Sequence, residues 1–358
     1  MVEFIDLFSG IGGMRIGFEE AGCECVFSSE IDRHAQDTYE TNFGERPIGD
    51  IRDITSDQIP PHDILIGGFP CQPFSIAGVS KLSSMGREHG LIEETRGTLF
   101  YEISRILEHH QPKAFLLENV KGLIWHGNPL HKVEGLGAKR IESLLEEFGS
   151  RRNAVNATEG ELQRVHGIGE VLSKRIRNSR TFPIINQILE SLGYNVTHKV
   201  ISSANFVPQR RERVFIVGFL QDVKFGFPDP PDQKPVLADI LEEDVDPKYT
   251  LNDHLWNYHQ ERKKMQKEKG NGFGYRMFAP NDTSGTLPAR YYKDGADILL
   301  EQPGGNPRRL TPRECARLMG FPDDFVLNKS EVQAYKQLGN AVVPPVVAMI
   351  AKAMVKQL

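Results

Sequence analysis

The feature that most constrains the fold is the strand, glycine turn and helix with which the chain begins. Residues 4–8 form a short apolar run, residues 9–13 contain three glycines, and residues 14–21 have a helical pattern. This order is typical of the first unit of a nucleotide-binding parallel sheet, whose turn lets the backbone approach a ligand closely. The spacing differs from GxGxxG, because Arg15 occupies the last glycine's place. We therefore expect a ligand without a pyrophosphate.

Later strand ends carry acidic residues. Glu30 follows the short strand 26–29, about twenty residues after the first glycine of the turn, where an acidic residue typically binds ribose hydroxyls. Asp50 lies at a third expected strand end, and Glu118 ends the apolar run 114–117. The first two acids predict a cofactor that contains adenosine. Glu118 is a candidate catalytic acid, with a simple turn cap as the alternative interpretation.

A single cysteine follows another apolar run. Residues 63–66 have the pattern of a buried strand, two glycines follow, and Cys71 stands between Pro70 and Gln72. At the end of a parallel strand this cysteine is a candidate nucleophile, although by itself a small buried cysteine is an equally good interpretation. None of the four cysteines forms a CxxC pair, so the sequence predicts no zinc or other metal site and no disulfide framework.

Length and charge set the outer limits. A chain of 358 residues can bury a large α/β core and add a smaller unit. The strand at residues 4–8 leaves no room for a signal peptide, and no apolar run approaches the roughly 18 residues of a membrane span. We therefore expect a cytoplasmic protein without a membrane partner. The net charge of −5 means that any nucleic-acid surface needs locally concentrated positive charge.

A basic run, residues 209–213, stands directly before the apolar strand 214–218, so at least one of its arginines is expected to point into a cleft. With the segments above, it resembles the motif series of the DNA (cytosine-5) methyltransferases, most closely the Dcm-type enzymes. The matching segments are residues 6–13, Pro70-Cys71-Gln72, Glu118-Asn119-Val120, residues 209–213, 313–322 and 337–342. The resemblance covers almost the whole chain except residues 128–180.

The resemblance implies an α/β fold of the S-adenosylmethionine-dependent methyltransferase type. This fold is Rossmann-like, with a mostly parallel seven-stranded sheet, helices on both faces and a small irregular target-recognition domain. The cofactor would be S-adenosylmethionine, which leaves as S-adenosylhomocysteine, and no metal is implied. The residues expected to bind the cofactor are Phe8, Gly10, Ile11, Gly12, Glu30, Ile31, Asp50, Ile51, Phe69, Pro70, Leu99, Asn340 and Val342.

The resemblance also implies a mechanism. Cys71 would add to C6 of a flipped cytosine, which activates C5 to accept the methyl group. Glu118 would assist at N3 and at the exocyclic amine. Arg211 would contact the base edge, and Arg213 is also assigned to the catalytic site. The loop of residues 76–97 would close over the base.

Residues 219–330 are expected to form the target-recognition domain, because periodicity weakens there while proline, glycine and basic residues become more frequent. The resemblance implies double-stranded DNA as substrate, with the inner cytosine of CCWGG or of a related CCNGG-type site as the target. An exposed helix is expected at residues 259–269, with solvated charges. The expected DNA contacts are Gln72, Ser75, Arg276, Thr286, Arg290 and Lys293, although each charge taken singly fits an ordinary exposed loop equally well.

Residues 128–180 depart from the family pattern. Glycine hairpins at residues 135–137 and 167–169 each precede a helical pattern, and the pair resembles an all-α tandem helix-hairpin-helix module. A GxG turn at a helix start aims backbone N–H groups at a phosphate. Such modules bind DNA without reading its sequence, although some bind only protein. The expected DNA contacts of this insertion are Gly135, Gly137, Lys139, Gly167, Gly169 and Lys174.

The remaining segments complete the predicted organisation. Residues 1–127 and 181–218 are the two parts of the catalytic domain, and residues 331–358 return to it with a helix over 344–354. Two other functions stay open: an RNA cytosine-5 methyltransferase, since the tRNA branch shares the Pro-Cys-Gln and Glu-Asn-Val signatures, and a catalytically silent DNA-binding regulator. We expect a monomer on the nucleoid of a prokaryotic cell, with a cognate restriction endonuclease as a possible partner.

Overall fold

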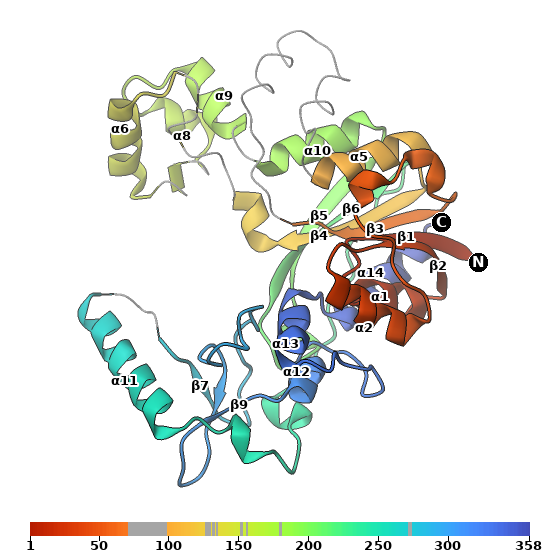
Figure 1. Cartoon of the computed structure of the whole chain (residues 1–358). Coiled ribbons are helices and arrows are strands. Elements are labelled where there is room, and N and C mark those ends of the chain that lie inside the picture. Colours follow the sequence, from red (N-terminus) through yellow and green to blue (C-terminus); the bar gives the residue numbers. More distant parts are fainter. Residues whose placement is uncertain are drawn as a thin grey trace.

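The computed structural model describes residues 1–70, 99–125, 130, 133, 135–150, 153–154, 157–178, 181–270 and 274–358. The predictions for Cys71, Gln72, Ser75 and the loop 76–97 therefore lie outside the described residues. Figure 1 shows a central sheet with helices on both faces, a group of inserted helices on one side, and a second, irregular part below the sheet. The predicted α/β class is confirmed.

The central sheet has six strands among the described residues, in the order β2-β1-β3-β4-β6-β5. The first four are parallel, and β6 is antiparallel to both of its neighbours. The strands are β1 (Val2–Leu7), β2 (Cys23–Ser29), β3 (Ile64–Gly68), β4 (Ala114–Val120), β5 (Asn195–Ser202) and β6 (Glu212–Phe219).

The seventh strand expected from the resemblance is absent from the described part of this sheet. Its place beside β2 is taken by a single bridge between Ser29 and Ile48. Pro47, just before this bridge, has no N–H to donate to a ladder. Asp50, just after it, caps a 3-10 helix and turns the chain away. The third predicted strand end is thus a one-residue bridge that still delivers Asp50 to the sheet edge.

Alternating side chains of the strands bury two separate apolar cores. Phe4, Ile64 and Leu116 pack in one core with residues of α1 (Gly13–Glu20) and α14 (Pro344–Val355). Ile5 and Leu65 pack in the other with residues of α5 (Leu99–His110) and α10 (Thr181–Ser191). Both faces are covered, as expected for parallel strands that read as continuous apolar runs. The remaining helices beside this sheet are α2 (Arg33–Phe43), α12 (Pro312–Leu318) and α13 (Glu331–Asn340).

The contact between α1 and α14 fixes the C-terminal segment on the sheet. A Cβ atom on Gly17 would lie 2.7 Å from Val347, so only glycine allows the two helices to approach this closely. The stretch Glu331–Val355 is long and apolar enough to cross a membrane by composition, but 61% of its most apolar window is buried inside the protein. Its apolar character is accounted for by this packing, with Pro344 at the start of α14.

The recognition part contains little regular structure. It has a three-stranded sheet in the order β7-β8-β9 and one long helix, α11, which begins at Asp253, earlier than predicted, because the Asn252 side chain accepts a hydrogen bond from the backbone of Leu255. Leu287, Tyr291 and Leu310 from this part belong to the same buried core as α1 and α14. The elements are α11 (Asp253–Glu268), β7 (Met277–Phe278), β8 (Leu299–Leu300) and β9 (Arg308–Arg309).

The inserted helices have a core of their own. Leu144, Leu162 and Ile176 are fully buried against one another's helices and belong to neither core of the central sheet. Val171, an apolar residue in the helical pattern after the second hairpin, is by contrast 64% exposed. The helices are α6 (Ala138–Phe148), α8 (Glu159–Gln163) and α9 (Glu170–Asn178), and Figure 1 shows them standing apart from the sheet.

Short 3-10 helices join these elements. They are η1 (Ile51–Asp53), η2 (Ser56–Gln58), η3 (Lys121–Trp125), η5 (Ser203–Asn205), η6 (Leu237–Ile240) and η7 (Pro247–Tyr249).

Candidate active site

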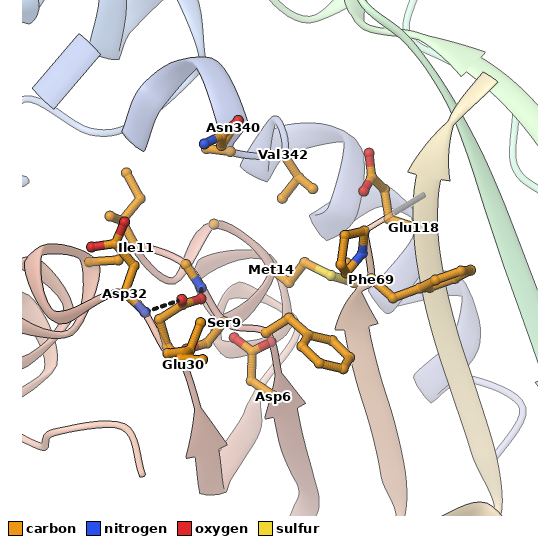
Figure 2. Close-up of a pocket in the computed structure, with 18 of the residues that line it drawn as sticks. Asp6, Ser9, Ile11, Met14, Glu30, Asp32, Phe69, Glu118, Asn340 and Val342 are labelled. Carbon is orange, nitrogen blue, oxygen red and sulfur yellow. Dashed lines mark hydrogen bonds between the residues drawn. The ribbon is translucent and has the colours of Figure 1, made fainter. Parts of the chain in front are cut away.

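A pocket of about 550 Å³ opens at the carboxyl ends of β1, β2, β3 and β4, closed on its other side by α13 and the segment that follows it. This is the edge at which parallel sheets bind ligands. Figure 2 shows side chains from these separate segments converging on it. Of the residues predicted to bind a cofactor, those that line the pocket are Phe8, Gly10, Ile11, Glu30, Ile31, Asp50, Ile51, Phe69, Pro70, Leu99, Asn340 and Val342.

Gly12 is the exception among the predicted cofactor residues. It is the N-cap of α1 with a φ of +84°, and a Cβ atom on it would collide with the ring of Phe43. It does not line the pocket. Glycine is needed at this position because the chain turns into α1 in close contact with α2. Gly12 therefore supports the shape of the turn without contacting a ligand in the pocket.

Glu30 is held in place by backbone hydrogen bonds. The N–H of Gly10 donates to one carboxylate oxygen at 2.8 Å, and the N–H of Asp32 donates to the other at 2.8 Å (Figure 2). These bonds tie the glycine turn to the end of β2. Each carboxylate oxygen keeps lone pairs that can accept hydroxyl groups of a ligand.

Asp50 is positioned by its own turn. Its side chain accepts from the backbone N–H of Arg52 at 3.0 Å, and the Arg52 guanidinium pairs with the same carboxylate. The hydrogen bond to Arg52 lowers the pKa of Asp50, so this pocket carboxylate is ionised at neutral pH.

Asp6 is a pocket residue to which the sequence analysis assigned no role. It is 1% exposed, and neither carboxylate oxygen has a hydrogen-bond partner among the described residues. Burial raises its pKa well above the ordinary value, opposed in part by the nearby Arg15. Ser9 and Ser29 also line the pocket. Their hydroxyl groups are buried and have no hydrogen-bond partner among the described residues. Nε of Arg211, which also lines the pocket, is likewise buried without a partner among the described residues, and four such polar side chains around one pocket indicate a ligand that supplies hydrogen-bonding groups.

Glu118 and Arg213 meet at the end of the pocket nearest β4. Oε1 of Glu118 lies 2.9 Å from Nε of Arg213, and both side chains are largely buried, at 11% and 17% exposure. The antiparallel register pairs Val120 with Arg213, so Arg213 is the diagonal cross-strand neighbour of Glu118. Burial raises the pKa of Glu118, while the charges of Arg213 and Arg211 oppose this shift.

Arg211 occupies a different environment, two residues earlier. Its guanidinium donates to the backbone carbonyls of Leu287, Gly339 and Ala341 at 3.1, 3.0 and 2.7 Å. It is 3% exposed, and burial lowers its pKa to about 9. Arg211 thus joins β6, the recognition part and the end of α13, with both terminal nitrogens already bonded to backbone.

Asn119 is a second residue without an assigned role in the sequence analysis. Its Nδ2 donates to the carbonyl of Phe69 at 2.7 Å, and its Oδ1 accepts from the backbone of Val120. Phe69 also packs on Phe100 of α5, with ring centroids 5.7 Å apart. The segment that leads through Pro70 toward Cys71 is therefore anchored to β4 beside Glu118.

The predicted DNA contacts lie in other parts of the structure. Arg276, Thr286, Arg290 and Lys293 are exposed in the recognition part. The Arg290 side chain is 72% exposed, with Asp297 3.6 Å away, and the hydroxyl of Thr286 donates to the carbonyl of Arg210.

The two hairpins of the insertion are alike in backbone but differ in charge. Gly135 and Gly167 both have left-handed φ angles, +83° and +81°, and Gly137 and Gly169 stand directly before α6 and α9. Lys139 is exposed, and no acidic residue lies in the first turn of α6. The first turn of α9 contains Glu170, which pairs with Lys174 at 2.5 Å.

Comparison with known families identifies the class. The family model for C-5 cytosine-specific DNA methylases matches residues 2–149 and 171–356, and a model for a SAM-like helix-hairpin-helix tandem matches residues 128–179. The chain therefore belongs to the C-5 cytosine-specific DNA methylases. It is a DNA (cytosine-5-)-methyltransferase of an S-adenosylmethionine-dependent family, and it carries a tandem helix-hairpin-helix insertion.

Individual relatives of the chain are consistent with this family assignment. The chain is 44% identical to Type II methyltransferase M.DsaV of Dactylococcopsis salina, over 99% of this chain and 86% of that protein. It is 39% identical to the DNA-cytosine methyltransferase of Escherichia coli strain K12, over 98% of this chain and 77% of that protein. The crystal structure of the S. pombe Dnmt2 methyltransferase has the same fold, with a TM-score of 0.67, 19% identity and coverage of 99% and 98% of the two chains.

Proposed function

We propose that this enzyme methylates C5 of a cytosine that is flipped out of duplex DNA, through a covalent bond between Cys71 and C6 of the base. The target is the inner cytosine of CCWGG or of a related CCNGG-type site. The observation that carries the proposal is one continuous pocket, with a cofactor wall at β1 and β2 and the buried Glu118–Arg213 pair at β4. Pro70, the residue before Cys71, also lines it.

The pocket fits S-adenosylmethionine. Glu30 would accept the ribose hydroxyls, because its two oxygens are already oriented by backbone N–H groups. Asp6 would accept the α-ammonium group, which supplies donors to a buried carboxylate that otherwise has none among the described residues. When bound, the cofactor supplies an electrophilic methyl group on a sulfonium cation. The carboxylates around the pocket favour that positive charge electrostatically.

The chemistry of the chain itself begins with Cys71. Its Sγ, as the thiolate, forms a bond to C6, and the electron pair of the C5–C6 double bond becomes available at C5 for methylation. Loss of the C5 proton to solvent then allows the Sγ–C6 bond to break and regenerates the thiolate and the double bond. A free cysteine thiol has a pKa of about 8.5, so only a small fraction is thiolate at neutral pH. Addition therefore needs help at the base.

Glu118 provides that help. Because burial raises its pKa, this carboxyl can hold a proton for N3 of cytosine, and it can accept the exocyclic amine. We assign the contact with the base edge to Arg213, which forms an ion pair with Glu118. We do not assign it to Arg211, because both of its terminal nitrogens already donate hydrogen bonds to backbone carbonyls. Arg213 would stabilise negative charge that develops on the base.

The burial of the candidate catalytic residues supports base flipping. Glu118 lines the pocket and the whole residue is 8% exposed, so a base stacked inside a duplex cannot reach it. The exposed basic residues of the recognition part, Arg276, Arg290 and Lys293, would contact the duplex around the extruded base.

The insertion would add a contact that does not read sequence, through backbone N–H groups at its hairpins. The first hairpin is the better phosphate site, because the second has Glu170 at its helix start. Deletion of residues 128–180 with a short linker should weaken DNA binding and reduce its salt dependence. Unchanged binding would favour a protein partner for the module.

The cellular setting is also proposed by similarity. Relatives named as Type II methyltransferases suggest that this enzyme works in the cytoplasm as a monomer on the nucleoid, alone or beside a cognate restriction endonuclease.

The direct test is substitution of the nucleophile. Cys71→Ala should abolish methyl transfer to DNA and leave DNA affinity within a few-fold of wild type. With a target whose cytosine carries fluorine at C5, no C5 proton can be lost after methylation, so wild-type protein should keep the Sγ–C6 bond and show a mass shift equal to one DNA strand under denaturing conditions, and Cys71→Ala should not. Normal turnover by the alanine variant would refute the covalent mechanism.

A further inference from the structure

Helix α11 of the recognition part is almost entirely exposed. His259 is its only buried residue among those described, and the remaining contacts of the helix are made along one side. The sequence indicates a solvated helix here, but the distribution of charge is uneven. Residues 260–270 carry five basic side chains against two carboxylates, in a chain whose net charge is −5.

Three lysines lie close together on α11 without an ion-pair partner among the described residues. In the described part of the chain, seven other lysines lie within 4 Å of a carboxylate: Lys113, Lys121, Lys174, Lys199, Lys248, Lys336 and Lys352. Lys263, Lys264 and Lys267 form no such pair with any described residue. Three unneutralised charges on one helix cost repulsion energy unless a polyanion binds there.

These three lysines share one face of the helix. Gln260, Lys263, Lys264 and Lys267 follow the i, i+3, i+4, i+7 spacing that places side chains together. The exposed apolar residues Tyr258 and Met265 do not follow this spacing and lie on a different face. Trp256 lies on the same stripe as the lysines but packs on Tyr275, and the positive charge of the lysine face complements a phosphate backbone.

Lys263, at the edge of the lysine face, and Trp256, two turns before it on the same stripe, fix the helix to the recognition part. The rings of Trp256 and Tyr275 meet at 4.7 Å, and Nζ of Lys263 lies 4.0 Å above the Tyr275 ring. A Cβ atom on Gly274 would lie 2.9 Å from Lys263, so this segment is clasped against the helix. It leads directly into Arg276 and β7. The lysine face is thus held rigidly next to a segment already expected to contact DNA.

We propose that the lysine face of α11, formed by Lys263, Lys264 and Lys267, binds the phosphate backbone of the duplex outside the recognition sequence. This inference rests on the proposed function, because it assumes a duplex in the active site. In Figure 1, α11 extends on the same side of the view as the inserted helices α6 and α8, away from both termini. The enzyme would then hold its substrate by charge through two separate elements, the insertion and α11.

The test replaces two of the lysines and measures the salt dependence of binding. In Lys264→Gln/Lys267→Gln, Lys263 is kept because it also packs on Tyr275. The matched control is Lys329→Gln/Lys356→Gln, which changes the net charge equally at two exposed lysines without ion pairs among the described residues. The slope of log affinity against log salt should become shallower by about 1.8 in the first variant, since each phosphate contact contributes about 0.9.

The expected results separate the two levels of the proposal. When the salt concentration rises fourfold, the affinity of both proteins falls. With a slope shallower by about 1.8, the factor by which it falls should be about tenfold smaller for the variant than for wild type. The preference for cognate over mismatched DNA should stay unchanged, because phosphate contacts carry no sequence information. Equal slopes for both variants and wild type would refute the role of α11. Wild-type protein that neither binds nor methylates duplex DNA would instead refute the proposed function.

Discussion

Two arginines that stand two residues apart should respond to substitution in opposite ways. Arg211 joins three backbone carbonyls from separate segments, whereas Arg213 pairs with the candidate catalytic carboxyl of Glu118. We predict that Arg211→Gln mainly lowers the free energy of unfolding, and that Arg213→Gln mainly lowers the turnover number for methyl transfer.

The magnitudes follow from the contacts. Loss of the Arg211 guanidinium leaves three carbonyls without a donor, and each buried unsatisfied group costs about 1–3 kcal/mol. Part of this is offset because the buried cation is itself costly, as its lowered pKa of about 9 indicates. We expect a net loss of about 3 kcal/mol. In Arg213→Gln, Glu118 can take up a proton, so stability should change by less than about 1 kcal/mol, while lost charge stabilisation lowers turnover by about 10²–10³.

Urea unfolding at 25 °C measures the change in the free energy of unfolding. Single-turnover methyl transfer at 25 °C, with saturating DNA and cofactor, measures the change in turnover. The reasoning would be wrong if Arg211→Gln kept wild-type stability but lost methyl transfer, since Arg211 would then act on the base. It would also be wrong if Arg213→Gln turned over at the wild-type rate. Arg213→Lys is a useful control, because it keeps the charge but loses the planar guanidinium.

Three further predictions concern pH and the insertion. Burial lowers the pKa of His62 to about 4, so the contribution of the neutral side chain to stability is complete above pH 6.5 and is lost as the pH falls toward 4. In urea unfolding, wild type should lose about 2 kcal/mol more than His62→Gln between pH 7.5 and pH 5. Equal losses for the two proteins would contradict this. Because the pKa of Glu118 is raised, turnover should fall as the pH rises through that pKa, and Glu118→Gln should show a low, flat profile over the same range. In the insertion, Lys139→Gln should reduce the salt slope of DNA binding by about 0.9, whereas Lys174→Gln, already paired with Glu170, should leave it unchanged; the reverse order would reject our choice of hairpin.

The strands and the pocket wall were predictable because their signals are local. The runs 4–8, 63–66 and 114–117 are largely apolar, as is typical of strands buried on both faces, and each is followed closely by glycine or an acid. Since the carboxyl ends of parallel strands meet at one edge, the residues after these runs were expected to converge, and twelve of the predicted cofactor residues do line one pocket.

What could not be predicted depends on register and packing. Asp6 sits within an apolar strand, and its lack of a partner is visible only in three dimensions. Which arginine reaches Glu118 is decided by the antiparallel register of β4 and β6, which places Arg213 diagonally across from it. The seventh strand is reduced to one bridge because Pro47 and the cap at Asp50 leave no room for a ladder.

The most direct test of the central claim is to incubate the purified enzyme and S-adenosylmethionine with a random duplex DNA library, and to read the products by bisulfite sequencing at single-base resolution. We predict C5 methylation confined to the inner cytosine of CCWGG or of a related CCNGG-type site, and none with Cys71→Ala. Methylation at an unrelated motif would keep the chemistry and reject the proposed target. No methylated cytosine in any DNA sequence would contradict the account.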